Sequence, residues 1–470
     1  MQIVLQSFGP IKTFTFDLAK EFHIIVGENS VGKSYAMTMV YLILKTLLSL
    51  ETRNIQVALD FEAFSELEQI DQAVDRLSSV PLSASRSANE AVEIAFRYLF
   101  ETYFLGQLRE SIANTFDPIG VLQNATSQDE FRLTISSKRC TIVLHLDREE
   151  ISVKSLEFSE IYIVKGAKTY RSTTNTNEGR VLYHNTIDPK HIKTALLSEA
   201  FQILSGMAAE VGARFSSIHY LPASRSGLYR ALTAFGQIVA EFAKKRTLST
   251  KPIYLPSIPE PLSDYFINLA SIALDTGRYE GSPLNQVAQS IEKEILHGQV
   301  EFDSETKRIF FAPDKTELRL DLAVTSSMVS ELSPIVAYLR HILTVPMRPS
   351  AGAKRRQTSA KSLIVIEEPE AHLHPKVQTM LVEQLVALTK IGITVVLTSH
   401  SNYIFNKTSN LVISGTLPSK SVAATLFRMT NEGSEGRPLA VDQYGIDDEN
   451  FVETAEALYM EKAEALEVNA

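Results

Sequence analysis

Residues 22–34, FHIIVGENSVGKS, join an apolar run to a glycine-rich loop, and a helical pattern follows at residues 34–48. The loop matches G-x-x-x-x-G-K-S, and strand, loop and helix in this order are typical of a phosphate-binding P-loop. Glycines let backbone N–H groups curl around phosphate oxygens, and the start of the helix adds positive potential. The spacing predicts that Lys33 contacts the β- and γ-phosphates of ATP and that the Ser34 hydroxyl holds Mg²⁺. The motif predicts these nucleotide-binding residues: Gly27, Glu28, Asn29, Ser30, Val31, Gly32, Lys33, Ser34 and Tyr35.

A pair of glutamates ends a second apolar run, in residues 362–375, SLIVIEEPEAHLHP. Two acids at the end of a strand could simply reach solvent. In P-loop NTPases, however, an acidic strand end lies beside the P-loop strand and supports the metal, and a second acid there can polarise the attacking water. We therefore expect Glu367 at the Mg²⁺ position and Glu368 as the general base. Glu367 is one methylene longer than the usual Asp, which favours contact with the metal through water.

His400 ends a third apolar segment, ITVVLTSHS at residues 393–401. A histidine at the end of a strand beside a P-loop can contact the γ-phosphate and report its presence. The alternative is a capping or core histidine. With the P-loop and the glutamate pair in the same chain, we count His400 with Lys33 and Glu368 as catalytic residues.

Composition limits the class of protein. The chain has 470 residues, of which 44% are hydrophobic, so it can build a large core. A net charge of −9 excludes a globally basic nucleic-acid coat, although a local patch could still bind DNA. The single cysteine, Cys140, cannot form an intrachain disulfide, which favours the cytoplasm. The apolar run at residues 39–50 is too short to span a membrane, so we expect no membrane partner.

These motifs together resemble the ABC-type ATPase heads of the SMC, RecF and OLD (overcoming-lysogenization-defect) proteins. The resemblance rests on LQSFGPIKTFTFDL and IIVGENSVGKS, on LIVIEEPEAHLHP, on VVLTSHS and on IHYLPASRSGLYR. It implies an α/β fold, an ABC-type P-loop ATPase head with a mainly parallel core sheet, an antiparallel β subdomain and helical insertions. Full OLD nucleases carry a TOPRIM domain after the head, and we expect a head without one because few residues follow His400.

The resemblance also assigns the ABC signature to residues 326–333, SSMVSELS. In such heads the signature opens a helix that meets the γ-phosphate bound by the other subunit. Ser326 and Ser327 would then complete a partner's site, in a homodimer or higher homo-oligomer whose heads enclose ATP. Met328 stands where a glycine is common. The alternative is an ordinary capped helix.

Insertions must separate the motifs, because Lys33 and Glu368 lie further apart in sequence than a compact head requires. Alternating segments at residues 131–137, 140–147 and 150–158 predict antiparallel strands. The predicted parts are 1–50, the N-terminal part of the head with the P-loop; 51–117, a helical insertion; 118–226, a β subdomain and the return to the core; 227–297, a helical lobe; 298–425, the C-terminal part of the head; and 426–470, a tail.

Similar stand-alone ATPases act in bacterial anti-phage defence, such as the Septu ATPase PtuA and the PARIS ATPase AriA. This resemblance predicts an ATP-hydrolysing subunit that dimerises around ATP and controls an effector encoded beside it, a nuclease or toxin. One alternative is a RecF-like repair or recombination ATPase that binds DNA directly, through the basic segments at 244–246 and 345–361. Others are an ATP-binding scaffold with little hydrolysis, suggested by Met328, and a transporter cassette. Arg225 would face a phosphate or a partner head, or form a structural salt bridge.

Overall fold

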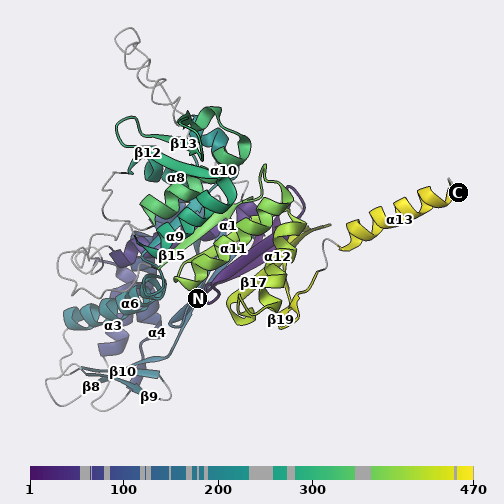
Figure 1. Cartoon of the computed structure of the whole chain (residues 1–470). Helices are drawn as coiled ribbons and strands as arrows, with labels where there is room; N and C mark the ends of the chain where they lie inside the picture. The colour runs from purple at the N-terminus through teal and green to yellow at the C-terminus, as the bar shows by residue number, and fades with distance from the viewer. Residues whose placement is uncertain are drawn as a thin grey trace, which may run out of the picture. The chain divides into compact units, whose positions relative to one another are not determined.

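The structure is a computed structural model, shown in Figure 1. It describes residues 1–52, 64, 66–78, 85–116, 122, 129–147, 150–165, 172–176, 179–184, 189–231, 258–272, 281–343, 361–448 and 452–468. The chain divides into two compact units. The first unit comprises Met1–Phe8, Leu42–Asn124 and Gln128–Arg214, and the second unit comprises Gly9–Tyr41, Ala125–Ser127 and Phe215–Ala470.

A mainly parallel sheet forms the centre of the second unit. Its parallel strands lie in the order β11-β15-β16-β3-β17, and β18 then pairs antiparallel to β17 and parallel to β2. Strands β3, β15 and β16 are buried at every residue, as continuous apolar runs in a parallel sheet should be. The strands are β2 (Ile11–Asp17), β3 (Phe22–Gly27), β11 (Ser217–Leu221), β15 (Ser362–Glu367), β16 (Thr394–Ser399), β17 (Val422–Thr430) and β18 (Gly433–Leu439).

Helices of the second unit bury their apolar residues in one cluster with these strands. Helix α11 contacts β16 and also α12, its neighbour in Figure 1. Side chains cap several helices: Ser401 accepts hydrogen bonds from the first turn of α12, and Ser282 does so for α9. The helices are α1 (Lys33–Thr52), α8 (Glu260–Ala270), α9 (Pro283–Ser290), η5 (Ile291–Leu296), η6 (Leu322–Val324), α10 (Ser327–Ala337), η7 (Tyr338–Ile342), α11 (Pro375–Lys390), α12 (Asn402–Ile413), η8 (Ser419–Ser421) and α13 (Val452–Val468).

Two small sheets complete the second unit. One has the order β12-β13-β14 and the other pairs β19 with β20. Their strands are β12 (Gly298–Asp303), β13 (Arg308–Pro313), β14 (Leu320–Asp321), β19 (Val441–Asp442) and β20 (Gly445–Ile446).

The first unit combines an antiparallel sheet with helices. Strands β5, β6 and β7 pair antiparallel, which confirms the prediction from their alternating patterns, and β1 pairs with β5. A second sheet has the order β4-β8-β10-β9. The elements are β1 (Gln2–Phe8), α3 (Glu68–Ser78), β4 (Ser85–Ser87), α4 (Asn89–Phe100), η2 (Glu101–Leu105), α5 (Gly106–Thr115), β5 (Arg132–Ser136), β6 (Cys140–Asp147), β7 (Glu150–Phe158), β8 (Ile161–Lys165), β9 (Ser172–Thr176), β10 (Gly179–His184) and α6 (Pro189–Gly212).

The predicted α/β fold, with a mainly parallel core sheet, an antiparallel region and helical insertions, is confirmed. The basic segments predicted at 244–246 and 345–360 lie outside the described residues. Among the helices that are described, none has the length and apolar character needed to cross a membrane.

Candidate functional site

The parallel arrangement brings the candidate residues to one edge of the sheet. Strands β3, β15 and β16 pair in parallel, so their carboxyl ends meet at the same edge. The P-loop follows β3, the glutamate pair straddles the end of β15, and His400 comes directly after β16. Segments far apart in the sequence therefore supply one site.

Two glycines give the P-loop its path. Gly27 has a φ of +145° and Gly32 a φ of +88°, conformations that L side chains rarely adopt. A Cβ atom at Gly27 would lie 2.4 Å from the carbonyl oxygen of Phe427 in β17. A side chain would therefore force the loop away from the strand that packs beside it.

Lys33 lies at the start of α1 and is 5% exposed. Its ammonium donates to the carbonyl oxygens of Gly27 at 2.9 Å and Glu28 at 2.6 Å. It also lies 3.2 Å from Nδ1 of His400. Burial lowers the pKa of Lys33 to about 8, although the charges of nearby carboxylates, led by Glu368, oppose this shift.

Contacts of Lys33 and His400 define the tautomer of the histidine. An ammonium group can only donate, so Nδ1 of His400 accepts and the proton of the neutral ring lies on Nε2. Nε2 is 3.5 Å from Oε1 of Glu368. Lys33, His400 and Glu368 thus form a continuous series of polar side chains.

Glu368 occupies a left-handed backbone conformation, with a φ of +42°, immediately after β15. Its N–H donates to the carbonyl oxygen of Thr398 at 2.9 Å, which links the ends of β15 and β16. The hydrogen bond from His400 lowers the pKa of the Glu368 carboxyl, against an opposing effect of burial. The side chain is 41% exposed, so this ionised carboxylate is accessible to water.

Glu367 is oriented differently, and only 7% of it is exposed. Its Oε2 accepts from the N–H of Ala223 at 3.3 Å, whereas Oε1 has no hydrogen-bond partner. A buried carboxylate oxygen without a partner is costly, and a metal-bound water would satisfy it. The exposed Ser34 at the start of α1 supplies a hydroxyl of the kind that Mg²⁺ accepts. These residues therefore fit Mg²⁺.

One pocket of about 590 Å³ joins the P-loop to the catalytic candidates. The pocket unites Lys33, Glu368 and His400, three residues that the sequence assigned to catalysis. Gly27, Glu28, Glu367, Ser326 and Ser327 do not line it. Its lining residues are Pro10, Asn29, Ser30, Val31, Gly32, Lys33, Ser34, Tyr35, Glu368, Thr398 and His400.

Sequence reasoning missed three residues that support this site. The buried Oγ1 of Thr398 has no hydrogen-bond partner and lines the pocket. Oε1 of Glu370 accepts from the N–H of His400 at 2.6 Å and from Oγ of Ser399 at 2.9 Å, and so positions the histidine. Tyr220 lies near Glu367, and burial followed by the Glu367 charge raises the pKa of its hydroxyl well above the ordinary value. Thr398 could have been found from its position two residues before His400.

The proposed signature residues lie at the start of α10. Ser326 caps the helix, since its Oγ accepts from the N–H of Val329 at 3.4 Å. Ser326 and Ser327 are both exposed, whereas Met328 is partly buried and packs against the core. The capped helix that we considered as an alternative is therefore present, and the exposed serines remain accessible to another molecule.

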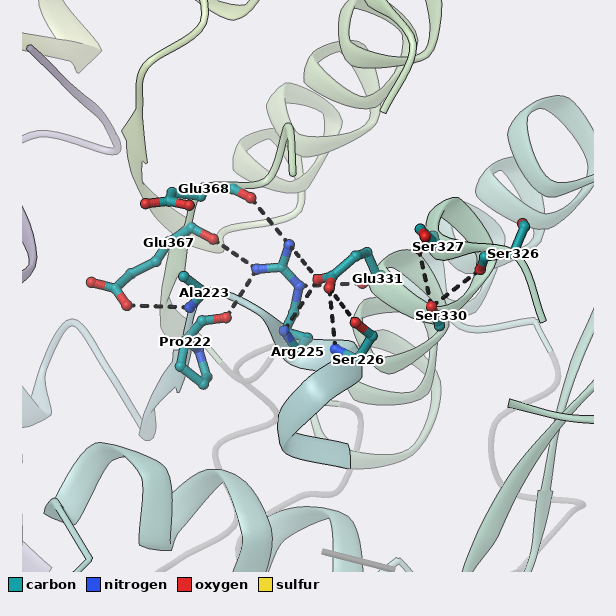
Figure 2. Close-up of polar contacts among 10 residues, drawn as sticks. All are labelled: Pro222, Ala223, Arg225, Ser226, Ser326, Ser327, Ser330, Glu331, Glu367 and Glu368. Carbon is teal, nitrogen blue, oxygen red and sulfur yellow. Dashed lines mark hydrogen bonds and ion pairs between the residues drawn. The ribbon is translucent and has the colours of Figure 1, made fainter. Parts of the chain in front are cut away.

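Arg225 forms a structural salt bridge, as one of the two sequence-based alternatives predicted. Arg225 and Glu331 are both fully buried, and NH2 of Arg225 lies 3.4 Å from Oε2 of Glu331. Figure 2 shows the guanidinium between this carboxylate and the main-chain oxygens of Glu367 and Glu368. Direct contact with a phosphate or with a partner head would require Arg225 to leave this position.

His372 and His374 were also considered as metal ligands, without being favoured. His374 caps α11, because its Nδ1 accepts from the N–H of Lys376 at 3.3 Å. Over the described ranges, no group of three or more His, Cys, Asp or Glu side chains could hold a metal ion. A Mg²⁺ held mainly by water, phosphate and a serine does not need such a group.

Comparisons with known proteins agree with an ATPase assignment for part of the chain. Residues 236–405 match the AAA ATPase domain family, and this range includes Glu367, Glu368 and His400 but not the P-loop. No curated protein matches the sequence. The match covers about a third of the chain, so the rest of the assignment depends on the site itself.

Solved structures of SMC heads are similar at low identity. The SmcHead bound to the C-winged helix domain of ScpA is 10% identical over 93% of this chain and 97% of that chain, with a TM-score of 0.39. An SMC head domain from Thermotoga maritima is 10% identical over 94% and 98%, with a TM-score of 0.35. The Smc head domain derived from Pyrococcus furiosus, with an extended coiled coil and bound to the C-terminal domain of ScpA, is 11% identical over 98% of each chain, with a TM-score of 0.36. Similarity at this level carries no argument about activity or partners.

Proposed function

We propose that the protein binds ATP with Mg²⁺ and hydrolyses it in the pocket beside the P-loop. The observation that carries this proposal is the continuous series Lys33, His400 and Glu368, whose neighbouring side chains are 3.2 Å and 3.5 Å apart. A cation for the phosphates, a histidine and an ionised carboxylate are groups that phosphoryl transfer to water requires. All three lie in one pocket with the P-loop.

Lys33 and the P-loop bind the phosphates. The N–H groups at the start of α1 donate to phosphate oxygens, as helix N-termini commonly do. The Lys33 ammonium exchanges its contacts with the Gly27 and Glu28 carbonyls for phosphate oxygens. Ser34, together with Glu367 through water, holds Mg²⁺, which neutralises charge on the β- and γ-phosphates.

Glu368 accepts the proton of the attacking water. Its lowered pKa keeps it ionised at neutral pH, and its exposure admits water. The Nε2–H group of His400 faces the carboxylate and orients it, while Glu370 fixes the backbone of His400. A positioned general base contributes about 10²- to 10⁴-fold to the rate.

Dimerisation around ATP is the second part of the proposal. Ser326 and Ser327 lie at an exposed helix start and are absent from the pocket that holds Lys33. A helix N-terminus attracts anions, so this end of α10 suits the γ-phosphate of a nucleotide bound by a second copy. Each site of the dimer would then need residues from both chains.

Association and release of the heads would control an effector protein, a nuclease or toxin encoded nearby, in anti-phage defence. This role rests on the family resemblance, because the pocket chemistry is common to heads with several uses. A RecF-like ATPase that binds DNA directly is the alternative. The two differ in whether DNA changes the turnover of the isolated protein.

The first test measures ATP turnover by the full chain, with and without double-stranded DNA, against Glu368→Gln. We expect wild-type turnover, a loss of about 10²- to 10⁴-fold in the variant, and unchanged ATP affinity. Glu317→Gln makes the same chemical change at an exposed position outside the pocket and should retain full turnover. ATP binding without turnover by the wild type would favour the scaffold alternative, and stimulation by DNA would favour the RecF-like one.

A further inference from the structure

The guanidinium of Arg225 uses all of its donors inside the protein. Nε donates to the carbonyl oxygen of Glu331 at 3.2 Å, and NH1 donates to those of Pro222 at 3.1 Å and Glu367 at 2.7 Å. NH2 donates to the carbonyl oxygen of Glu368 at 3.2 Å and faces the Glu331 carboxylate at 3.4 Å. An Arg side chain has five N–H donors, and five oxygens surround this one. The side chain is therefore held in a single orientation.

Glu331 is held equally firmly. Its Oε1 accepts from the N–H of Ser226 at 3.2 Å and from its hydroxyl at 2.6 Å. Its Oε2 accepts from the N–H of Arg225 at 3.1 Å. The carboxylate thus satisfies the first N–H groups of the helical segment 225–231 as well as the guanidinium. Well-packed apolar residues would often stabilise a fold as much as a buried ion pair does, so the contacts of this pair point to a positional role.

The acceptors of Arg225 are the main-chain oxygens of the catalytic segment. Glu367 and Glu368 carry the proposed metal and base functions on the same residues whose carbonyls contact the guanidinium (Figure 2). A movement of Arg225 would therefore move the backbone from which both carboxylates extend.

Glu331 connects to the exposed start of α10. It lies in the second turn of that helix, and Oγ of the neighbouring Ser330 donates to the carbonyl oxygens of Ser326 and Ser327, each at 3.1 Å. Figure 2 shows the serines at the end of α10 that leads to Glu331 and Arg225. The helix start and the end of β15 are joined by one continuous set of hydrogen bonds.

We infer that the Arg225–Glu331 pair couples the two nucleotide sites of a dimer. This inference rests on the proposed function, in which α10 contacts the partner's nucleotide while Glu367 and Glu368 act on the chain's own. The pair transmits the position of α10 to the catalytic carboxylates, so ATP in one site changes turnover in the other. Arg225 and Glu331 are positioning residues, since neither lines the pocket.

The test compares the ATP dependence of turnover in the wild type, Ser226→Ala, Arg225→Lys and Ser333→Ala. Ser226→Ala removes the 2.6 Å hydrogen bond to Glu331 but keeps the ion pair. Ser333→Ala is the matched control: it removes a hydroxyl in the same helix that donates to the carbonyl of Val329 at 2.7 Å, away from Arg225. ATP affinity and thermal unfolding of each variant report whether it is folded.

We expect a Hill coefficient above one for the wild type and for Ser333→Ala. In Ser226→Ala and Arg225→Lys the coefficient should fall toward one and kcat should fall about tenfold, within the usual range of coupling effects, with ATP affinity unchanged. Wild-type turnover without cooperativity, or cooperativity preserved in Ser226→Ala, would overturn the inference and leave the proposed function standing. Absence of wild-type turnover would instead remove the proposed function. If Arg225→Lys does not fold, Ser226→Ala decides.

Discussion

Nζ of Lys33 lies 3.2 Å from Nδ1 of His400, and the opposite nitrogen of the same ring faces Glu368. The residue that binds phosphate is therefore in contact with the residue that orients the base. Arrival of a nucleotide draws the ammonium toward phosphate oxygens and changes the charge that His400 meets. The protonation state of Lys33 is the first property of this contact that can be measured.

ATP affinity should fall at alkaline pH because of Lys33. Burial sets the pKa of Lys33 to about 8 without nucleotide, and phosphates favour the charged form. Below this pKa the site is ready to bind, whereas above it binding must take up a proton. The dissociation constant should then rise about tenfold per pH unit above pH 8. Titration with a fluorescent ATP analogue over this range measures the slope.

Lys33→Arg is the control for this pH dependence. An Arg side chain stays charged throughout the range, so the variant should lose the slope even if its affinity is lower. Equal slopes in the wild type and Lys33→Arg would assign the titration to another group.

Glu367→Gln should weaken the use of Mg²⁺. The unpartnered Oε1 of Glu367 is suited to a metal-bound water, and loss of such a contact commonly costs about 10- to 100-fold in metal affinity. Calorimetry of ATP binding at increasing Mg²⁺ should show half-saturation shifted upward by this factor. Binding of ATP without Mg²⁺ should match the wild type. If the Mg²⁺ dependence does not change, Glu367 has no part in holding the metal.

Ser327→Asp should block ATP-dependent dimerisation. The new carboxylate would repel the γ-phosphate of a partner's nucleotide, while an acid in the first turn stabilises the helix itself. On a Glu368→Gln background, light scattering should show an ATP-dependent dimer that Ser327→Asp abolishes, with ATP binding by the monomer intact. A dimer that forms equally well with Asp at this position would exclude the start of α10 from the interface.

Mixing two inactive variants tests the shared site more sharply. Lys33→Ala removes the phosphate contact of one chain, and Ser327→Asp removes the contribution to the partner. A mixed dimer retains one complete site, with Lys33 and Ser327 supplied by different chains. Turnover should therefore reappear on mixing. No recovery, despite formation of mixed dimers, would contradict a site built from two chains.

Gly27→Ala should destabilise the protein, and Gly227→Ala should not. At Gly27 the φ of +145° and the carbonyl of Phe427 at 2.4 Å together predict a loss of about 2 to 4 kcal/mol in the free energy of unfolding. At Gly227, in the helical segment 225–231, no atom lies within 4 Å of the new Cβ, so a change within about 1 kcal/mol is expected. Denaturant unfolding of both variants measures the difference. Equal stabilities would mean that the P-loop can shift away from β17.

Local patterns were sufficient to predict the strands of the site. The apolar runs before Gly27 and Glu367 are continuous because both faces of the parallel sheet are covered, and this signal is contained within a few residues. The Lys33, Glu368 and His400 constellation followed because each residue directly adjoins the end of such a strand.

Contacts between distant segments were not predictable in the same way. Nothing near Arg225 in the sequence identifies Glu331 as its partner, since the pairing depends on how α10 packs. Pro334 would also end α10 by the usual rule, yet the helix continues to Ala337. Ser333, Pro334 and Ile335 are all buried there, which indicates that tertiary packing outweighs the local cost.

The position of β3 in the sheet has a consequence for synthesis on the ribosome. This strand comes from the first 30 residues, but its neighbours, β16 and β17, come from residues 394–430. Contacts of such long sequence separation form slowly and cannot form before both segments exist. The nascent chain therefore carries its P-loop without a completed sheet until almost the whole protein has been translated. Acquisition of nucleotide binding would mark the end of folding, and a chain truncated before β16 would emerge with its nucleotide-binding strand exposed to chaperones.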